Sequence, residues 1–352
     1  MPNTSSPAKV QTKIVVPGSH SMVSLLGSRD ELLRVVEQAF ETDIHVRGNE
    51  ITITGDPDEV ALATKLFEEL VTLLERGDTL TVDAVERSLA MLRAATDERP
   101  ADVLTMNILS SRGRTIRPKT LNQKRYVDVI DKHTVVFGIG PAGTGKTYLA
   151  MAKAVQALQA KQVNRIILTR PAVEAGERLG FLPGTLYEKI DPYLRPLHDA
   201  LHDMVDPDSI PRLMAAGTIE VAPLAYMRGR TLNDAFIILD EAQNTSPEQM
   251  KMFLTRLGFG SKMVITGDVT QTDLPAGTQS GLRIVESILQ GIEDVHFCRL
   301  TSADVVRHKL VSEIVDAYAR YDSQQEAPRP ARRGPRPVPD PHRHDPRHRR
   351  ED

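Results

Sequence analysis

The residues from Gly140 to Thr147 read GPAGTGKT and match the pattern G-x-x-x-x-G-K-[ST] in full. Glycines at this spacing let the backbone wrap closely around phosphate oxygens, and the N-terminus of the following helix favours an anion. Lys146 is expected to contact the β- and γ-phosphates of a nucleotide, and Thr147 to bind Mg²⁺. The candidate nucleotide contacts are Gly140, Pro141, Ala142, Gly143, Thr144, Gly145, Lys146 and Thr147.

Two carboxylates end the apolar run in FIILDEAQN, from Phe236 to Asn244. A phosphate-binding loop needs a carboxylate from a neighbouring strand to hold Mg²⁺, and Asp240 is placed for that task. Glu241 follows it and can orient or deprotonate an attacking water. This second acid favours hydrolysis over transfer to a small acceptor. The alternative, a solvated rim of acids at a strand end, is weakened by the phosphate loop in the same chain.

A third polar segment, Gly267-Asp268-x-x-Gln271, follows the apolar run from Lys262 to Thr266. The carboxyl ends of parallel strands lie on one edge of the sheet, so this segment is expected beside the phosphate loop. Gln271 is a candidate sensor of the γ-phosphate, with Asp268 as its supporting partner.

The elements that must position these side chains alternate between strand and helix patterns over residues 120–322. Short, nearly continuous apolar runs precede loop-rich or helical segments: TVVFGIG, NRIILTR, TIEVAP, AFIILDE and KMVITGD. Strands of this kind are buried on both faces of a parallel sheet. The pattern predicts an α/β fold with helices on both faces of a parallel sheet, and together with the phosphate loop it resembles a RecA-like P-loop NTPase.

Residues 12–95 are predicted to form a separate small α+β domain in the order β-α-α-β-β-α, with a hairpin at Gly48-Asn49 and a helix starting at Asp56. This order resembles a KH domain, whose members clamp nucleic-acid backbones with a GXXG loop. Here the loop is Gly27-Ser28-Arg29-Asp30, in which an acid replaces the second glycine and would repel phosphate. RNA binding by this loop and a domain used for protein contacts both stay open.

Two further segments are polar. Residues 96–119 are predicted to be a linker, in which the basic stretch from Arg112 to Lys119 is either solvated or in contact with phosphates. Residues 323–352 are dense in Pro, Arg and His without apolar periodicity, so we expect a disordered tail.

Composition excludes several classes of protein. The formal net charge is −3, so any nucleic-acid binding would have to use local basic patches. Cys298 is the single cysteine, which excludes a disulfide framework and a cysteine-rich zinc site. The N-terminus lacks an apolar signal core, and no apolar stretch approaches the about 20 residues of a membrane span. These features predict a cytoplasmic protein without a membrane partner.

The combined motifs resemble the first motor domain of superfamily 1 helicases. Four segments are similar in sequence to the PhoH family, the phosphate-starvation-inducible ATPases of bacteria. They are TRPAVEAGERLGFLPG, FIILDEAQN, TGDVTQTDLP and DVVRH. The resemblance covers most of residues 12–322. It implies Mg²⁺-dependent ATP hydrolysis, a cytoplasmic location and a role in RNA metabolism.

The helicase likeness also implies roles for polar side chains outside the loop. Asn122 and Gln123 match the upstream glutamine motif that reads adenine, and a glutamine amide can pair with the adenine N6 donor and N7 acceptor. Gln243 is expected between the γ-phosphate and the polymer-binding face, where it would couple the two sites.

The same likeness places Thr169 and Arg170 toward nucleic-acid phosphates, and Arg228 and Arg230 form a second basic candidate. For each arginine a purely structural role is an equal alternative.

The chain after the third motif is too short for the second motor domain that follows in these helicases. That domain's arginine stabilises charge on the transferring phosphoryl group. Arg307 is the best candidate replacement, acting on the ATP of a neighbouring subunit in a ring-like homo-oligomer. The alternative is an ordinary surface or ion-paired arginine.

Three functions remain open from the sequence. The first is an ATPase that remodels or moves on RNA. The second is a nucleotide-switched binding protein without helicase activity, and the third is a P-loop kinase. The acid pair with its glutamine, and the absence of an obvious lid with phosphoacceptor features, disfavour the kinase.

Overall fold

A computed structural model describes residues 9–18, 21–94, 98–111, 113–171, 186–275 and 277–307, and the single positions 310, 311, 314 and 317. Within α8, the side chains of residues 186–193 are outside this description. The chain divides into two compact units, Met1–Val306 and Arg307–Asp352. The expected disordered tail and most of the segment that follows Arg170 lie outside the described residues.

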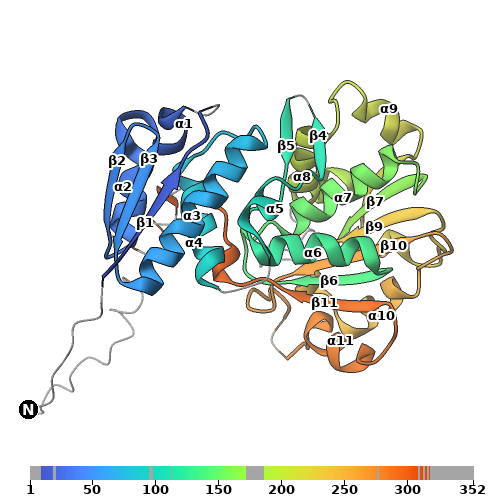
Figure 1. The fold of residues 1–352 in the computed structure, drawn as a ribbon. Coiled ribbons are helices and arrows are strands. Elements are labelled where there is room, and N and C mark those ends of the chain that lie inside the picture. Colours follow the sequence, from blue (N-terminus) through green and yellow to red (C-terminus); the bar gives the residue numbers. More distant parts are fainter. Residues whose placement is uncertain are drawn as a thin grey trace, which may run out of the picture. The chain divides into compact units, whose positions relative to one another are not determined.

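The first elements follow the predicted order. They are β1 (Val10–Val15), α1 (Met22–Leu26), α2 (Glu31–Ala39), β2 (Asp43–Arg47), β3 (Glu50–Gly55) and α3 (Pro57–Glu75), as Figure 1 shows. The three strands form an antiparallel sheet in the order β1-β3-β2. Leu32, Val36, Ile51, Ile53 and Phe67 belong to the core that the helices and this sheet share. The order β-α-α-β-β-α is therefore confirmed, and the KH assignment stays a prediction.

The predicted start of α3 is present in detail. Asp56 is the N-cap, its side chain accepts a hydrogen bond from Asp58 N, and Pro57 is the first helical residue. In the loop between α1 and α2, Gly27 has a φ of 80°, and a Cβ there would lie 2.7 Å from Glu31 Cγ. Arg29 and Asp30 also have positive φ values, 55° and 59°, so the position where the acid replaces the second glycine keeps a backbone conformation that favours glycine.

The segment expected to be a polar linker is folded in its described part. After α4 (Val82–Arg93) it contains α5 (Pro100–Leu104), β4 (Leu109–Ser111) and β5 (Arg114–Ile116). Ile108, Leu109 and Ile116 are buried in the core that lies on one face of the large sheet. The expectation of a linker was wrong for this part because three apolar residues in a polar context were enough to bind the hairpin to that core.

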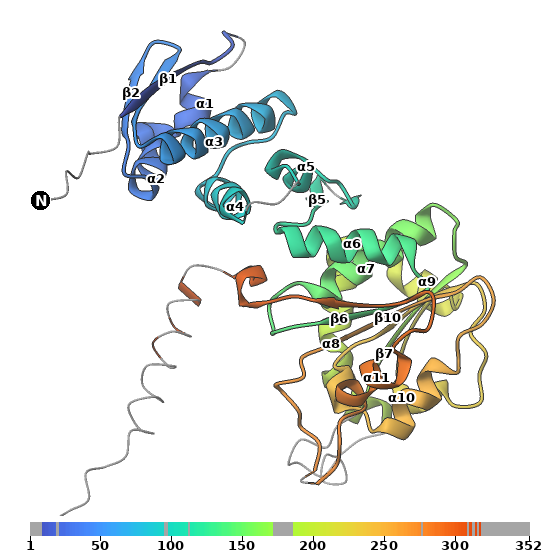
Figure 2. The same cartoon turned by 60° about the horizontal axis from the view of Figure 1, so that its bottom comes forward.

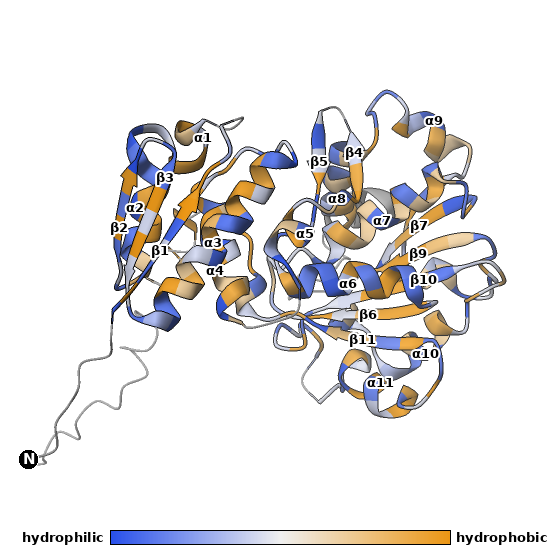
Figure 3. Ribbon diagram, viewed as in Figure 1, coloured by the Kyte–Doolittle hydropathy of each residue, from blue (hydrophilic) through white to orange (hydrophobic). Residues whose placement is uncertain are grey.

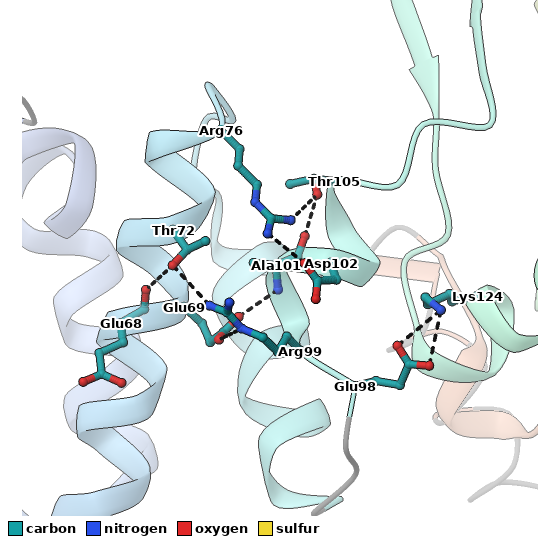
Figure 4. Close-up of polar contacts among 10 residues, drawn as sticks. All are labelled: Glu68, Glu69, Thr72, Arg76, Glu98, Arg99, Ala101, Asp102, Thr105 and Lys124. Carbon is teal, nitrogen blue, oxygen red and sulfur yellow. Dashed lines mark hydrogen bonds and ion pairs between the residues drawn. The ribbon is translucent and has the colours of Figure 1, made fainter.

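Buried polar contacts fix α5 to α3. The Glu69 carboxylate is buried, and it accepts hydrogen bonds from Arg99 Nε at 2.8 Å and from Ala101 N at 3.0 Å. Arg76 pairs with Asp102 at 2.7 Å beside it (Figure 4). Glu69 therefore satisfies a backbone donor at the first turn of α5 that would otherwise lack a partner.

Six parallel strands form the large sheet, in the order β11-β6-β10-β9-β7-β8. Their bounds are β6 (Val135–Ile139), β7 (Arg165–Arg170), β8 (Ile219–Pro223), β9 (Ala235–Leu239), β10 (Lys262–Gly267) and β11 (Val295–Arg299). Apolar residues dominate the inner strands (Figure 3). The predicted parallel sheet is confirmed.

Helices cover both faces of this sheet. They are α6 (Leu121–Lys132), α7 (Lys146–Gln159), α8 (Leu186–Met204), α9 (Ile210–Ala215), α10 (Pro247–Leu254) and α11 (Gly281–Leu289). In β9, Phe236 and Ile238 join the core with α6 to α8, whereas Ile237 and Leu239 join the core with α10 and α11. Figures 1 and 2 show these two helical layers on opposite faces. Successive side chains of a strand point to opposite faces of the sheet, and helices cover both faces here, which explains why every residue of β9 is apolar.

In the described part of the chain, no helix has the length and apolar content needed to cross a membrane.

Candidate nucleotide-binding site

The phosphate loop joins the end of β6 to the start of α7. Gly143 and Gly145 have φ values of 82° and 77°, which favour glycine. Gly140 N donates to Gly267 O at 3.1 Å, and a Cβ on Gly140 would lie 2.5 Å from Leu300 O. The loop is therefore held at its start by the ends of the two strands that flank β6.

Lys146 is folded back onto its own loop. Its Nζ donates to Gly140 O at 2.7 Å and to Pro141 O at 2.8 Å. Burial lowers the pKa of Lys146, and the carboxylates of Asp268, Asp240 and Glu241 partly oppose that shift. A phosphate oxygen could replace the two carbonyl partners without any change in the charge of the lysine.

Asp240 lies beside the first turn of α7. Its Oδ1 accepts hydrogen bonds from Thr147 Oγ1 at 2.6 Å and from Thr266 Oγ1 at 2.9 Å. Hydroxyl and carboxylate oxygens of this kind are the ligands that Mg²⁺ prefers. In the described residues no cluster of three or more His, Cys, Asp or Glu side chains is placed to hold a metal by itself. The donor set therefore fits a metal that keeps waters or phosphate oxygens as its other ligands.

The third motif lies at the same edge of the sheet. Asp268 Oδ1 accepts hydrogen bonds from the backbone and side chain of Thr270, whereas the buried Asp268 Oδ2 has no protein partner. An orphaned carboxylate oxygen is costly unless a ligand or water satisfies it. Gln271 and Asp268 line one cavity of about 270 Å³ with the loop and both acids; its residues are Ala142, Gly143, Gly145, Lys146, Thr147, Tyr148, Asp240, Glu241, Gly267, Asp268 and Gln271.

Glu241 and Gln243 form a connected pair at the end of β9. Gln243 is buried, its Nε2 donates to Glu241 Oε2, and its Oε1 accepts from Asp268 N at 3.0 Å. The other oxygen of Glu241 lies 3.1 Å from Arg170 Nη2 at the end of β7. Gln243 thus links the second and third motifs, and nothing in the described structure tests its expected contact with a polymer.

Gln123 is buried with both ends of its amide bound to the protein. Its Oε1 accepts from Lys119 N at 2.7 Å, and its Nε2 donates to Thr144 O in the phosphate loop at 3.0 Å. Asn122 Nδ2 donates to Asp304 Oδ2 at 3.0 Å. Adenine pairing by Gln123 would require these bonds to break, and it stays a prediction; in the structure the amide joins Lys119 to the phosphate loop.

Asp304 is a second support of the loop that the sequence analysis missed. The side chain is buried and accepts hydrogen bonds from Thr120 Oγ1 at 2.6 Å and from Thr301 N at 2.7 Å. Two residues on, Val306 N donates to Gly143 O at 3.0 Å. The signal was the spacing of Thr301 and Asp304, which form a capping box.

The residues expected to contact nucleic acid lie in different surroundings. Arg230 makes a two-pronged ion pair with Glu220 on β8, at 2.6 and 2.7 Å, and this pair lowers the pKa of Glu220. Arg228 is exposed, and Thr169 is buried. The pairing of Arg230 favours its structural alternative.

Tyr148 is a further residue that the sequence analysis missed. It lines the cavity directly after Thr147 and is 37% exposed, so a large ring lies at the mouth of the site. Arg307 is exposed and begins the second compact unit, and its role stays a prediction.

Comparisons with known proteins agree with these motifs. The family model described as "PhoH-like protein" matches residues 115–319. A PhoH-like protein of Mycobacterium tuberculosis is 69% identical over 315 residues, covering 90% of this chain and 89% of its own length. A PhoH-like protein of Bacillus subtilis is 52% identical over 301 residues, covering 85% and 94%, and Protein PhoH of Escherichia coli is 44% identical over 199 residues, covering 56% of each.

Similar solved structures are more distant. The Pif1 helicase from Candida albicans has 16% identity and a TM-score of 0.31, over 57% of this chain and 43% of that one. The Hef helicase domain of Pyrococcus furiosus has 16% identity and a TM-score of 0.33, over 58% and 47%. The sequence match, and not this distant likeness, identifies the family: the chain belongs to the PhoH-like proteins.

Proposed function

We propose that this protein is a Mg²⁺-dependent ATP hydrolase whose turnover is coupled to RNA. The observation that carries the proposal is the cavity at the carboxyl edge of the large sheet. It gathers the loop lysine, a hydroxyl–carboxylate pair, a second acid and a polar sensor from separate segments of the chain. Each of these groups has a distinct task in phosphoryl transfer to water.

The residues divide the reaction between them. The loop amides and Lys146 bind the phosphates, and Thr147 with Asp240 would hold Mg²⁺, which neutralises charge on the β- and γ-phosphate oxygens. Glu241 orients a water and accepts its proton. The water oxygen bonds to the γ-phosphorus while the bond to the bridging oxygen breaks, leaving ADP and phosphate. Gln271 lines the same cavity, and contact with the γ-phosphate is the role proposed for it.

RNA is proposed as the partner on two grounds. The N-terminal element order is the one expected of a KH-like module, and the motifs at the sheet edge resemble those of the first motor domain of superfamily 1 helicases. We also propose that the protein acts in the cytoplasm. A nucleotide-switched regulator without helicase activity is the second candidate, favoured by the two donors that occupy both oxygens of Glu241 and would slow turnover.

An ATPase assay with and without single-stranded RNA tests the proposal. We expect release of free phosphate that requires Mg²⁺ and rises when single-stranded RNA is added. Lys146→Ala and Glu241→Gln serve as inactive controls. Slow turnover that is indifferent to RNA would favour the switch, and a phosphorylated acceptor in place of free phosphate would overturn both candidates.

Arg307 is proposed to act on the ATP of a neighbouring subunit. An arginine supplied in this way contributes about 10³–10⁵ to turnover in other phosphoryl-transfer enzymes. Arg307→Ala should therefore lower kcat strongly while ATP binding, measured by titration calorimetry, stays unchanged. A mutant that hydrolyses ATP at the wild-type rate, or a wild-type protein that stays monomeric with ATP in light scattering, would contradict this role.

A further inference from the structure

Both oxygens of the Glu241 carboxylate are occupied by donors from different parts of the chain. Arg170 Nη2 lies 3.1 Å from Oε1, and Gln243 Nε2 donates to Oε2. Glu241 also has a φ of 52°, an uncommon conformation for a residue with a side chain. The acid that must accept a proton from water is thus held by its backbone and by both of its oxygens.

The two donors differ in how easily they can be displaced. Gln243 is 1% exposed and is itself fixed, because Asp268 N donates to its side-chain oxygen and Ser280 Oγ donates to its backbone carbonyl at 2.7 Å. The Arg170 side chain is 21% exposed at the carboxyl edge of the sheet, where Thr169 pairs with Leu239 in the neighbouring strand. Arg170 is therefore the donor that an external ligand can withdraw.

An anion that offers two oxygens to the planar guanidinium group at once is the ligand best suited to draw Arg170 away from Glu241. The guanidinium group binds phosphate in a two-pronged geometry, so the charge of Arg170 itself stays paired when a phosphate takes the place of the carboxylate. A phosphodiester backbone offers such anions in series. The carboxylates of Asp240, Glu241 and Asp268 oppose a single phosphate ion that the phosphate loop and Mg²⁺ do not hold, so at Arg170 a polymer held elsewhere along its length is favoured.

We propose that Arg170 is a positioning residue that restrains Glu241, and that the phosphodiester backbone of a single-stranded polynucleotide withdraws Arg170 and releases Glu241 toward water. This inference rests on the proposed function and explains how polymer binding would raise hydrolysis. The restraint is separate from Lys146 and Asp240, so it acts on turnover and leaves nucleotide binding unchanged.

The test compares Arg170→Ala, Arg170→Lys and a matched control, Arg165→Ala. Arg165 lies at the opposite end of the same strand and donates to Asn233 O, away from the cavity. The measured quantities are kcat and KM for ATP without RNA, the ratio of kcat with and without a single-stranded RNA of mixed sequence, and Tm. The Arg170–Glu241 ion pair is partly exposed and contributes little to stability, and Arg165 makes a 3.3 Å hydrogen bond to Asn233 O, so all three variants are expected to fold.

We expect Arg170→Ala to raise kcat without RNA several-fold at unchanged KM, and to lose most of the RNA stimulation. Arg170→Lys should lie between it and the wild type, and Arg165→Ala should match the wild type. The gain must disappear in the double variant Arg170→Ala/Glu241→Gln, because it depends on the released carboxylate. An unchanged or lower kcat in Arg170→Ala, or a gain that survives loss of Glu241, would overturn the restraint.

The outcomes also separate this inference from the proposed function. If wild-type protein hydrolyses ATP but ignores RNA, the RNA coupling fails, while a faster Arg170→Ala variant still supports the restraint. If wild-type protein shows no hydrolysis, phosphate release by Arg170→Ala supports the restraint and its absence overturns it. Should Arg170→Ala unfold, Arg170→Gln gives the same readouts with a side chain of similar length.

Discussion

Glu241→Gln is expected to slow ATP hydrolysis by about 100-fold or more, the usual contribution of a positioned general base. The amide keeps the size of the side chain but cannot accept the proton of the attacking water. Because Lys146, Thr147 and Asp240 are untouched, ATP binding should persist. Single-turnover phosphate release and titration calorimetry measure the two effects separately.

Glu286→Gln is a matched control for this variant. Glu286 is a partly exposed acid on α11 that pairs with Arg299, outside the cavity, so its replacement should leave both turnover and binding at the wild-type level. If Glu241→Gln hydrolysed ATP as fast as this control, Glu241 would not be the base, and the regulator without catalytic turnover would gain support.

Lys146→Ala is expected to weaken ATP binding about tenfold to hundredfold, because a hydrogen bond to a charged group contributes about 1.5–3 kcal/mol. It should also abolish measurable hydrolysis, because the ammonium group follows the γ-phosphate oxygens into the transition state. ATP raises the Tm of a protein that binds it, and this rise should be lost in the variant.

The Tm without nucleotide should remain close to that of the wild type. Burial lowers the pKa of Lys146, which means that holding the ammonium group costs the folded protein free energy. Alanine removes this cost together with the hydrogen bonds to Gly140 O and Pro141 O, so the two effects on the free energy of unfolding oppose each other. Lys132→Ala, at an exposed position in the last turn of α6, controls for loss of a positive charge. A full ATP-induced rise of Tm in Lys146→Ala would contradict the assignment of the loop.

Much of the fold could be predicted because its signals are local. The run from Ala235 to Leu239 is apolar at every position, which is typical of a strand covered on both faces, and the structure places its side chains alternately in two cores. Asp56 and Pro57 start α3 by interactions within one turn. The prediction for residues 96–119 failed because the burial of Ile108, Leu109 and Ile116 depends on a surface formed by distant helices.

The sequence predicted which side chains of the site lie close together, but not the hydrogen bonds that connect them. Motif spacing put Thr147, Asp240 and Gln271 at one sheet edge, since parallel strands share a carboxyl end. It could not show that Gln123 binds the backbone with both ends of its amide, or that Asp304 supports the loop. Such partners come from segments up to 184 positions apart.

By itself, the sequence determined the chemistry available to this protein: a phosphate loop, a carboxylate at Asp240 of the kind that can bind Mg²⁺, and a second acid at Glu241, because these depend on residue type and short spacing. Only the tertiary structure decided the state of that second acid. Arg170 meets Glu241 because β7 and β9 pair in parallel, which brings the ends of both strands to one edge of the sheet. That pairing is set by packing among distant segments, and spacing along the chain does not encode it.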